Sequence, residues 1–255
     1  MFPSHLPAEF TRLRIPEILP HIYILGSNAP GDKTRTRDRD RLIVGEDYIA
    51  RVEPDSALVG VPEAHLWWSS RASWDVTRSG LLERMPRPVV LSIPDTLCHR
   101  TSMGVSIPEL EEVLLYREPP DYRRRRAPGH RPPLVAGKDD AGIIASGGYE
   151  TGALSHARET DSIPMVSVDE RGIWVSRCHL TRRPLGLIEI AGVETTPGKR
   201  GEGNAKSFLF FAMEYSRDTA SGFIYLSGRD NEASLALAAS LGFHRITVFK
   251  KHLIT

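Results

Sequence analysis

Cysteine is scarce in this sequence. The 255 residues contain two, Cys98 and Cys178, and neither belongs to a CxxC pair. Two cysteines cannot form the disulfide framework of a small secreted domain, and isolated ones do not indicate a structural zinc site. The nine histidines show no metal-ligand spacing either, so the sequence predicts no metal. A reducing compartment, the cytoplasm, is the simplest location.

A dominant charge and a long apolar run are also missing. Lys and Arg number 33 against 32 Asp and Glu, so no overall field selects nucleic acid or an anionic membrane. No apolar run approaches the roughly 18 residues of a membrane span. The first residues, MFPSHLPAEFTRLR, lack the basic start and apolar centre of a signal peptide. With 40% apolar and 25% charged residues, the composition is typical of a soluble globular protein without membrane partners.

Residues 1–118 predict a smaller N-terminal domain of mixed α/β structure. Tyr48–Val52 resembles a strand that ends at Pro54-Asp55, and Arg87–Ile93 is a short β-branched run between prolines, as an inner strand often is. A short helix near Ala8–Leu13 and a strand at His21–Leu25 are expected as well. This half contains no glycine-rich phosphate turn.

The clearest change in composition is Glu118–Pro133, EPPDYRRRRAPGHRPP. Five prolines and five arginines with almost no aliphatic residue cannot build a core, so residues 119–133 are interpreted as a linker to a second domain, residues 134–255. Arg123–Arg126 and the mixed-charge run Asp32–Arg41 are the segments with charge suited to RNA. A solvated surface is the simpler interpretation of both, because no basic domain surrounds them.

The second domain opens with a meander of strands. Pro164–Val168 and Ile173–Leu180 flank Asp169-Glu170-Arg171-Gly172, a hairpin-turn sequence in which glycine supplies a positive φ. The apolar run Leu187–Val193 then predicts a buried third strand. Together they form three antiparallel strands.

A glycine-rich basic turn follows the third strand. Pro197–Gly203 reads PGKRGEG, and apolar residues at helical spacing come directly after it. A strand, a glycine turn and a helix N-terminus present free backbone N–H groups and a positive dipole end to an anion. Gly201 and Gly203 let the backbone approach a pyrophosphate, and Lys199 and Arg200 add positive charge. The turn is therefore predicted to bind phosphate.

A second β-like run, Phe223–Leu226, and a second helix, Asn231–Leu241, complete an order of elements that is similar to a known family. The matching residues are Glu189–Thr195, Pro197, Arg200–Ala205, Asn231, Ser234 and Leu241-Gly242-Phe243. On these residues, about 135–255 resembles the GCN5-related N-acetyltransferases (GNAT), and within them the FR47-like branch. The resemblance implies an α/β fold with a mostly antiparallel, splayed sheet flanked by helices.

The resemblance also implies acetyl-CoA or coenzyme A as co-substrate. In the family the turn binds the pyrophosphate, and the strand before it holds the pantetheine arm and the acyl carbonyl. The acyl group is then expected near Ala191–Val193. The residues that the resemblance assigns to the cofactor are Ala191, Gly192, Val193, Thr195, Lys199, Arg200, Gly201, Glu202, Gly203, Asn204, Ala205, Asn231 and Ser234.

Two positions depart from the family pattern. Gly198 stands where the family's turn often has Gln or Arg, three residues before its first glycine, and the backbone contacts should survive that change. Many relatives carry a tyrosine four residues before the Gly-Phe pair, as general acid for the departing thiolate, and here that position is Ala238. The FR47-like branch often lacks it too. Another acid, water or no acid at all are the alternatives, because coenzyme A thiolate is a tolerable leaving group at neutral pH.

Two glutamates are the candidates for a general base. Acylation needs a neutral amine, and a carboxylate acting directly or through water is the usual base. Glu194 lies nearest the expected acyl position, and Glu189 lies deeper. Their odd separation puts them on opposite faces of a regular strand, unless a bulge changes the parity.

The neighbouring strand ends in Cys178 and His179. Adjacent strand residues point to opposite faces, so the pair is no nucleophilic dyad, and Cys178 is expected to be buried. His179, His156 and Tyr149 are weaker candidates for the substrate pocket, and polar surface is their simpler interpretation.

The sequence thus favours an acyl-CoA-dependent N-acyltransferase that moves an acetyl group to the primary amine of a small molecule, by direct attack in a ternary complex. Two alternatives stay open. One is a transferase of the same fold that uses another donor such as aminoacyl-tRNA, the only case in which nucleic acid would be a partner. The other is a non-catalytic CoA-binding module.

Three roles are open for the N-terminal half: a degenerate second copy of the fold, a cap over the acceptor site or a docking module. We favour a degenerate or cap-like half that closes the substrate cleft.

Overall fold

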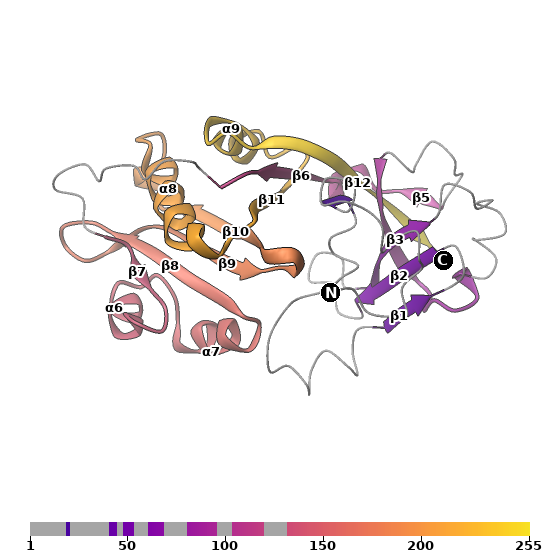
Figure 1. The fold of residues 1–255 in the computed structure, drawn as a ribbon, viewed down its shortest axis with the longest axis horizontal. Coiled ribbons are helices and arrows are strands. Elements are labelled where there is room, and N and C mark those ends of the chain that lie inside the picture. Colours follow the sequence, from indigo (N-terminus) through magenta and orange to yellow (C-terminus); the bar gives the residue numbers. More distant parts are fainter. Residues whose placement is uncertain are drawn as a thin grey trace.

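The computed structural model describes residues 19–20, 41–44, 48–53, 61–68, 81–95, 104–119 and 132–255. The strands in these ranges form one sheet in the order β1-β2-β3-β4-β12-β6-β11-β10-β9-β8-β7, with β5 paired to β12 (Figure 1). Their bounds are β1 Arg41–Val44, β2 Tyr48–Glu53, β3 Glu63–Trp68, β4 Val89–Pro94, β5 Val105–Ser106, β6 Glu112–Arg117, β7 Leu134–Val135, β8 Ser162–Val168, β9 Trp174–Arg182, β10 Leu187–Thr195, β11 Gly222–Gly228 and β12 His244–Ile254. The predictions for residues 8–13, 21–25, 32–40 and 123–126 fall outside the described residues.

Four α-helices in the described ranges flank the C-terminal part of the sheet: α6 Asp140–Ala145, α7 Thr151–Glu159, α8 Asn204–Ser216 and α9 Glu232–Ser240. The helices α8 and α9 begin where the sequence predicts them. Helix α7 was not predicted, because its sequence buries only Leu154 and Ala157 and is otherwise polar. None of the helices in the described part of the chain is both long and apolar enough to cross a membrane.

The predicted meander is present in β8, β9 and β10, which pair antiparallel in sequence order. The β8–β9 turn closes because the carboxylate of Asp169 accepts hydrogen bonds from the backbone N–H groups of Arg171 and Ile173. Gly172 has a φ of +79°, the positive value that the turn sequence predicts.

Alternation along the strands separates two layers. Cys178 lies opposite Met165 of β8, and both are buried in the core that α8 covers with Phe208 and Leu209. The neighbouring pair of residues, Arg177 and Val166, faces the other side, where α6 and α7 pack. The sheet is therefore covered by α8 and α9 on one face and by α6 and α7 on the other (Figure 1). The predicted α/β class with a mostly antiparallel sheet is confirmed.

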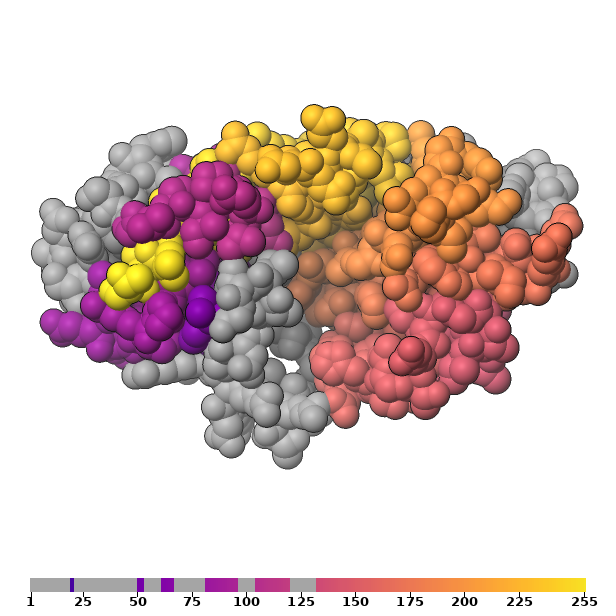
Figure 2. Space-filling model, turned by 180° about the vertical axis from the view of Figure 1, so that it is seen from behind, coloured from indigo at the N-terminus to yellow at the C-terminus, as the bar shows by residue number. Residues whose placement is uncertain are grey.

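The two halves of the chain exchange strands. In each half three antiparallel strands are followed by a parallel pair: β1-β2-β3 with β3/β4, and β8-β9-β10 with β10/β11. The last strand of each half then pairs with the other half, β6 with β11 and the end of β12 with β4. Figure 2 shows the last residues, yellow, lying among the purple strands of the N-terminal half.

This repeated order favours the interpretation of the N-terminal half as a degenerate second copy of the fold. It also means that the sheet continues across the boundary that the linker predicts. The division into domains at residues 118 and 134 stays a prediction.

A buried lysine stabilises the place where the strands cross. Lys251 of β12 is only 2% exposed, and its ammonium contacts the carboxylates of Glu63 on β3 and Glu112 on β6, the latter at 2.8 Å. Because a buried ammonium needs charged or polar partners, this one side chain connects β12 of the C-terminal half to β3 and β6 of the N-terminal half.

Candidate active site

Strand β10 diverges from β11 halfway along its length. The parallel pairing runs from Leu187 with Gly222 to Ile190 with Tyr225, and β10 continues to Thr195 beyond it. On its other side the register with β9 shifts between Ala191 and Glu194. Gly192, in this bulge, has a φ of +58°, which disfavours any residue with a Cβ. The splayed strand that the resemblance implies is therefore present, with the bulge at its opening.

The bulge changes the parity of the two glutamates. Glu189 lies opposite Thr181 and Glu194 opposite Arg177, and these two residues of β9 share a face. Glu189 and Glu194 consequently lie on the same face of the sheet, the face of α6 and α7. The two-residue period alone predicted opposite faces.

Both glutamates are held by arginines. Glu189 is only 5% exposed and accepts a hydrogen bond of 2.5 Å from Nε of Arg183. Glu194 accepts two from Arg177, at 2.9 Å to Nε and 2.5 Å to Nη2. Protonation of either carboxylate would remove the negative charge that its arginine pairs with.

Arg177 is itself fixed by aromatic rings. Its guanidinium lies 5.2 Å from the ring centroid of Tyr149 and 4.9 Å from that of Trp174, and it donates a hydrogen bond of 2.7 Å to the carbonyl of Gly148. These contacts leave the Glu194 carboxylate little freedom, because its partner is stacked and hydrogen-bonded as well.

The glycine turn connects β10 to α8 on the surface. A short 3₁₀ turn, Pro197–Lys199, is followed by Gly201 and Gly203, with φ of +80° and +79°, and Gly203 caps α8. Nε of Arg200 donates to the carbonyl of Thr195 at 3.0 Å. Asn204, predicted to contact cofactor, donates Nδ2 to the carbonyl of Lys199 at 2.9 Å and to the Glu202 carboxylate at 3.2 Å. Asn204 therefore organises the turn from within.

The turn has the properties of an anion cradle. A Cβ built on Gly198, Gly201 or Gly203 meets no atom within 4 Å, so the space above the turn is open. In the described chain no side chain caps the N-terminus of α8, and the first N–H groups of a helix have no partner within it. The exposed side chains of Lys199 and Arg200 flank this space. These features fit the pyrophosphate of a nucleotide cofactor.

Helix α9 carries the two remaining residues that the resemblance assigns to the cofactor, Asn231 and Ser234. Asn231 caps the helix by accepting the N–H of Ser234 at 3.1 Å, so this oxygen is already engaged. The Ser234 hydroxyl pairs with that of Tyr225 at 2.8 Å. Ala238 is fully buried in the core below α8. Tyr225 of β11, which the sequence did not single out, thus brings a phenol hydroxyl against α9, although the family's tyrosine position on that helix is Ala238.

His179, a weaker candidate for the substrate pocket in the sequence, lies beside the bulge. This half-buried residue pairs with Ala191, and a Cβ built on Gly192 would lie 3.0 Å from its Cδ2 and 3.7 Å from its Nε2. Burial lowers the pKa of His179, and the positive charges of Arg177 and His156 lower it further. Cys178 on the opposite face is fully buried, as predicted, and burial raises the pKa of its thiol. No sequence signal marks the contact between His179 and Gly192, because it depends on the bulge in the neighbouring strand.

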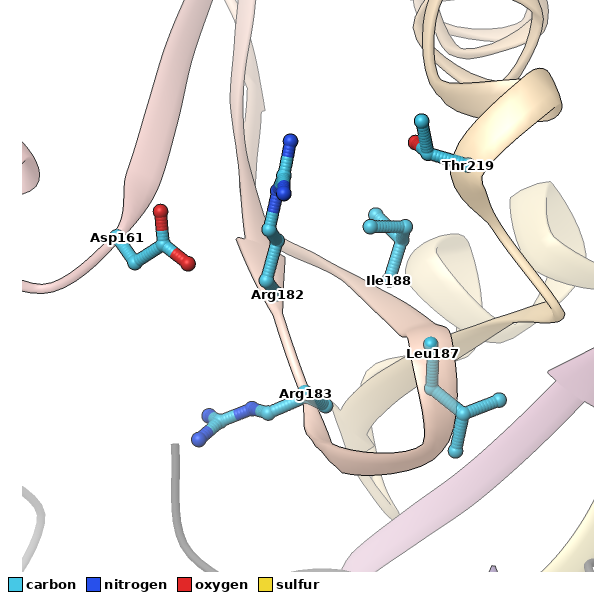
Figure 3. A pocket seen from close by; sticks show the side chains of 7 residues that line it. Asp161, Arg182, Arg183, Leu187, Ile188 and Thr219 are labelled. Carbon is cyan, nitrogen blue, oxygen red and sulfur yellow. The ribbon is translucent and has the colours of Figure 1, made fainter. Parts of the chain in front are cut away.

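A shallow pocket of about 150 Å³ lies at the opposite end of β10. Leu187 and Ile188 line it together with Arg182, and the carboxylate of Asp161 points toward that arginine (Figure 3). The predicted cofactor residues do not line this pocket. It lies at the start of β10, whereas the bulge and the glycine turn lie toward and beyond its end.

The fold is shared with solved acetyltransferase structures. A GCN5-related N-acetyltransferase from Kribbella flavida superposes with a TM-score of 0.55 at 16% identity, over 85% of this chain and 90% of that one. One from Sphaerobacter thermophilus gives 0.55 at 15% identity, over 100% and 96%. A tandem GNAT protein from the clavulanic acid biosynthesis pathway gives 0.54 at 14% identity, over 98% and 92%. No family model and no curated protein matches the sequence.

These likenesses extend over both halves of the chain, which agrees with the repeated strand order. At such identities they establish the fold and leave the activity and the FR47-like assignment as predictions. The described residues of both halves thus have the fold of the GCN5-related N-acetyltransferases.

Proposed function

We propose that the protein is an acyl-CoA-dependent N-acyltransferase that moves an acetyl group from acetyl-CoA to a primary amine of a small molecule. The observation that carries the proposal is the continuous path from the bulge in β10 to the open glycine turn. Strand edge and turn offer unpaired backbone groups to an extended pantetheine arm and to a pyrophosphate, as a CoA thioester requires. Acetyl-CoA supplies the activated acyl group when it is bound.

The chain's own part in such a reaction is positioning. The N–H groups of the splayed strand near Val193 are suited to hold the acyl carbonyl, and Lys199 and Arg200 to attract the phosphates. Attack by the amine then takes place within a ternary complex, where holding the reactants together lowers the barrier.

A second candidate is a non-catalytic CoA-binding module. The specific observation in its favour is the absence of a free acid or carboxylate base at the predicted positions: Ala238 is buried, and Glu189 and Glu194 are both paired to arginines. The aminoacyl-tRNA alternative depends on residues outside the described ranges and stays a prediction.

Calorimetric titration of the full chain with acetyl-CoA and with CoA tests the proposal. We expect binding of both, and Lys199→Gln should weaken it about two- to fivefold, the effect of losing one exposed charge pair. Lys138→Gln is the matched control, because Lys138 lies near Tyr215 at the other end of α8. No binding of either ligand would refute both candidate functions.

Thiol release from acetyl-CoA across a panel of primary amines then separates the two candidates. Release that depends on the amine supports the transferase. Binding without release for every amine supports the module.

A further inference from the structure

His179 is a titratable side chain that lies directly against Gly192 in the bulge of β10, beside the expected acyl position. Its ring lies against Gly192, with Nε2 3.7 Å from where a Cβ would be, and only glycine leaves that space open. The other edge of the ring packs on Tyr149, with ring centroids 4.9 Å apart in an edge-to-face arrangement. The imidazole is therefore held in one place beside the bulge.

The ring nitrogens of His179 have no hydrogen-bond partner among the described residues, and neither nitrogen is sealed from solvent. Glu189 and Glu194 on the same face differ in this respect, since arginines hold them. Of the three groups, the imidazole alone can accept a proton without breaking an ion pair.

The surroundings of His179 favour its neutral form. Burial is the main cause of its lowered pKa, followed by the positive charges of Arg177 on its own strand and His156 on α7. Tyr149 is the remaining titratable group in contact with the ring, and burial raises the pKa of that phenol. Residues paired with His179 across the sheet, Pro164 and Ala191, do not titrate. At neutral pH the ring is thus uncharged.

We propose that His179 is the general base that deprotonates the amine acceptor, which would approach from the α6/α7 face of the sheet. This inference rests on the proposed function. As the amine nitrogen forms its bond to the acyl carbon, the carbon–sulfur bond breaks, the thiolate leaves with the electron pair, and the ammonium proton passes to Nε2 of His179. Glu194 is then a structural partner of Arg177.

Nuclear magnetic resonance of the histidine imidazoles tests the placement without a known acceptor. Wild-type protein and His179→Gln identify the His179 signals. Acetyl-CoA should shift them, whereas adenosine 3′,5′-bisphosphate, which lacks the pantetheine arm, should shift only the amides of the turn near Gly201. Turn amides that respond to acetyl-CoA while His179 does not would overturn the proposal and leave the proposed function intact. No response of either would refute the proposed function itself.

Kinetics test the role. With the best amine of the panel, His179→Gln should lower kcat about 10²-fold or more, the usual effect of losing a general base, with acetyl-CoA affinity within twofold of wild type. The wild-type rate should rise with pH along a limb below pH 6.5, set by the lowered pKa of His179, and the variant should lack this limb. His244→Gln, an exposed histidine at the start of β12, is the control and should keep both rate and limb. A His179→Gln variant that retains the limb and loses less than about threefold in kcat would overturn the proposal.

Discussion

Acid should destabilise the protein through one buried histidine in the N-terminal half. Burial lowers the pKa of His65 to about 4, from an ordinary value of 6.5, and the charges of Lys251, Arg51 and Arg183 contribute to the lowering. In the unfolded chain this imidazole takes up a proton near pH 6.5, whereas in the folded protein it resists until about pH 4. The stability that the neutral His65 ring contributes is therefore fully present above pH 6.5 and is lost as the pH falls toward 4.

The size of the effect follows from the two pKa values. Each pKa unit corresponds to about 1.4 kcal/mol, so the full loss is about 3 kcal/mol, and about 2 kcal/mol of it should have occurred by pH 5. Urea unfolding at several pH values between 7.5 and 5 measures this loss directly. Over the same pH range, the free energy of unfolding of His65→Gln should fall by about 2 kcal/mol less than that of the wild type.

Comparing slopes removes the cost of the substitution itself, because that cost does not depend on pH. His244→Gln is the control, since His244 is exposed, and its curve should parallel the wild type. If the curves of His65→Gln and the wild type run parallel as well, the buried imidazole does not remain neutral and the reasoning is refuted.

Three further outcomes are expected. Lys251→Met should cost about 3–5 kcal/mol in urea unfolding, because Glu63 and Glu112 lose their shared cation, while Lys206→Met on the exposed side of α8 should change little. Gly201→Val should destabilise the protein by about 1–2 kcal/mol, because its φ of +80° disfavours a side chain, and it should weaken acetyl-CoA binding in calorimetry. A fragment of residues 132–255 should not fold in circular dichroism melts, since it lacks the β6 that pairs with β11 and the β4 that pairs with β12; a cooperative transition in that fragment would contradict the exchange.

The C-terminal elements were readable from the sequence because local patterns determine them. Alternation and the turn residues around Asp169 define the β8–β9 hairpin, and the apolar run of β10 followed by glycines defines the start of α8. The strand exchange was not readable. It depends on pairs such as Leu115 with Arg245, which lie far apart in the chain, and no local pattern specifies which edge such strands join.

The backbone features of the candidate site could be predicted from the sequence, whereas most of its side-chain contacts could not. The glycines predict the turn, because glycine is the residue that adopts positive φ values without strain. The pairing of Glu189 and Glu194 with arginines was hidden, since Arg177 and Arg183 belong to the neighbouring strand and corner, and strand register decides which charges meet. Asn204 was assigned to the cofactor because it matches the family's motif; that its amide closes the turn could not be predicted from the motif.

Gly192 explains why the bulge and the histidine belong together. A side chain at this position would be disfavoured by its φ of +58° and would also press on the His179 ring at 3.0 Å. The same bulge turns Glu194 toward Arg177, which donates two hydrogen bonds to Oε2 of the carboxylate. The bulge at this one glycine thus opens the strand and pairs Glu194, a candidate base in the sequence, with Arg177. It also leaves the neutral imidazole of His179 beside the opening. Because these effects have one origin, a base on β9 follows from the structure more directly than a base on β10.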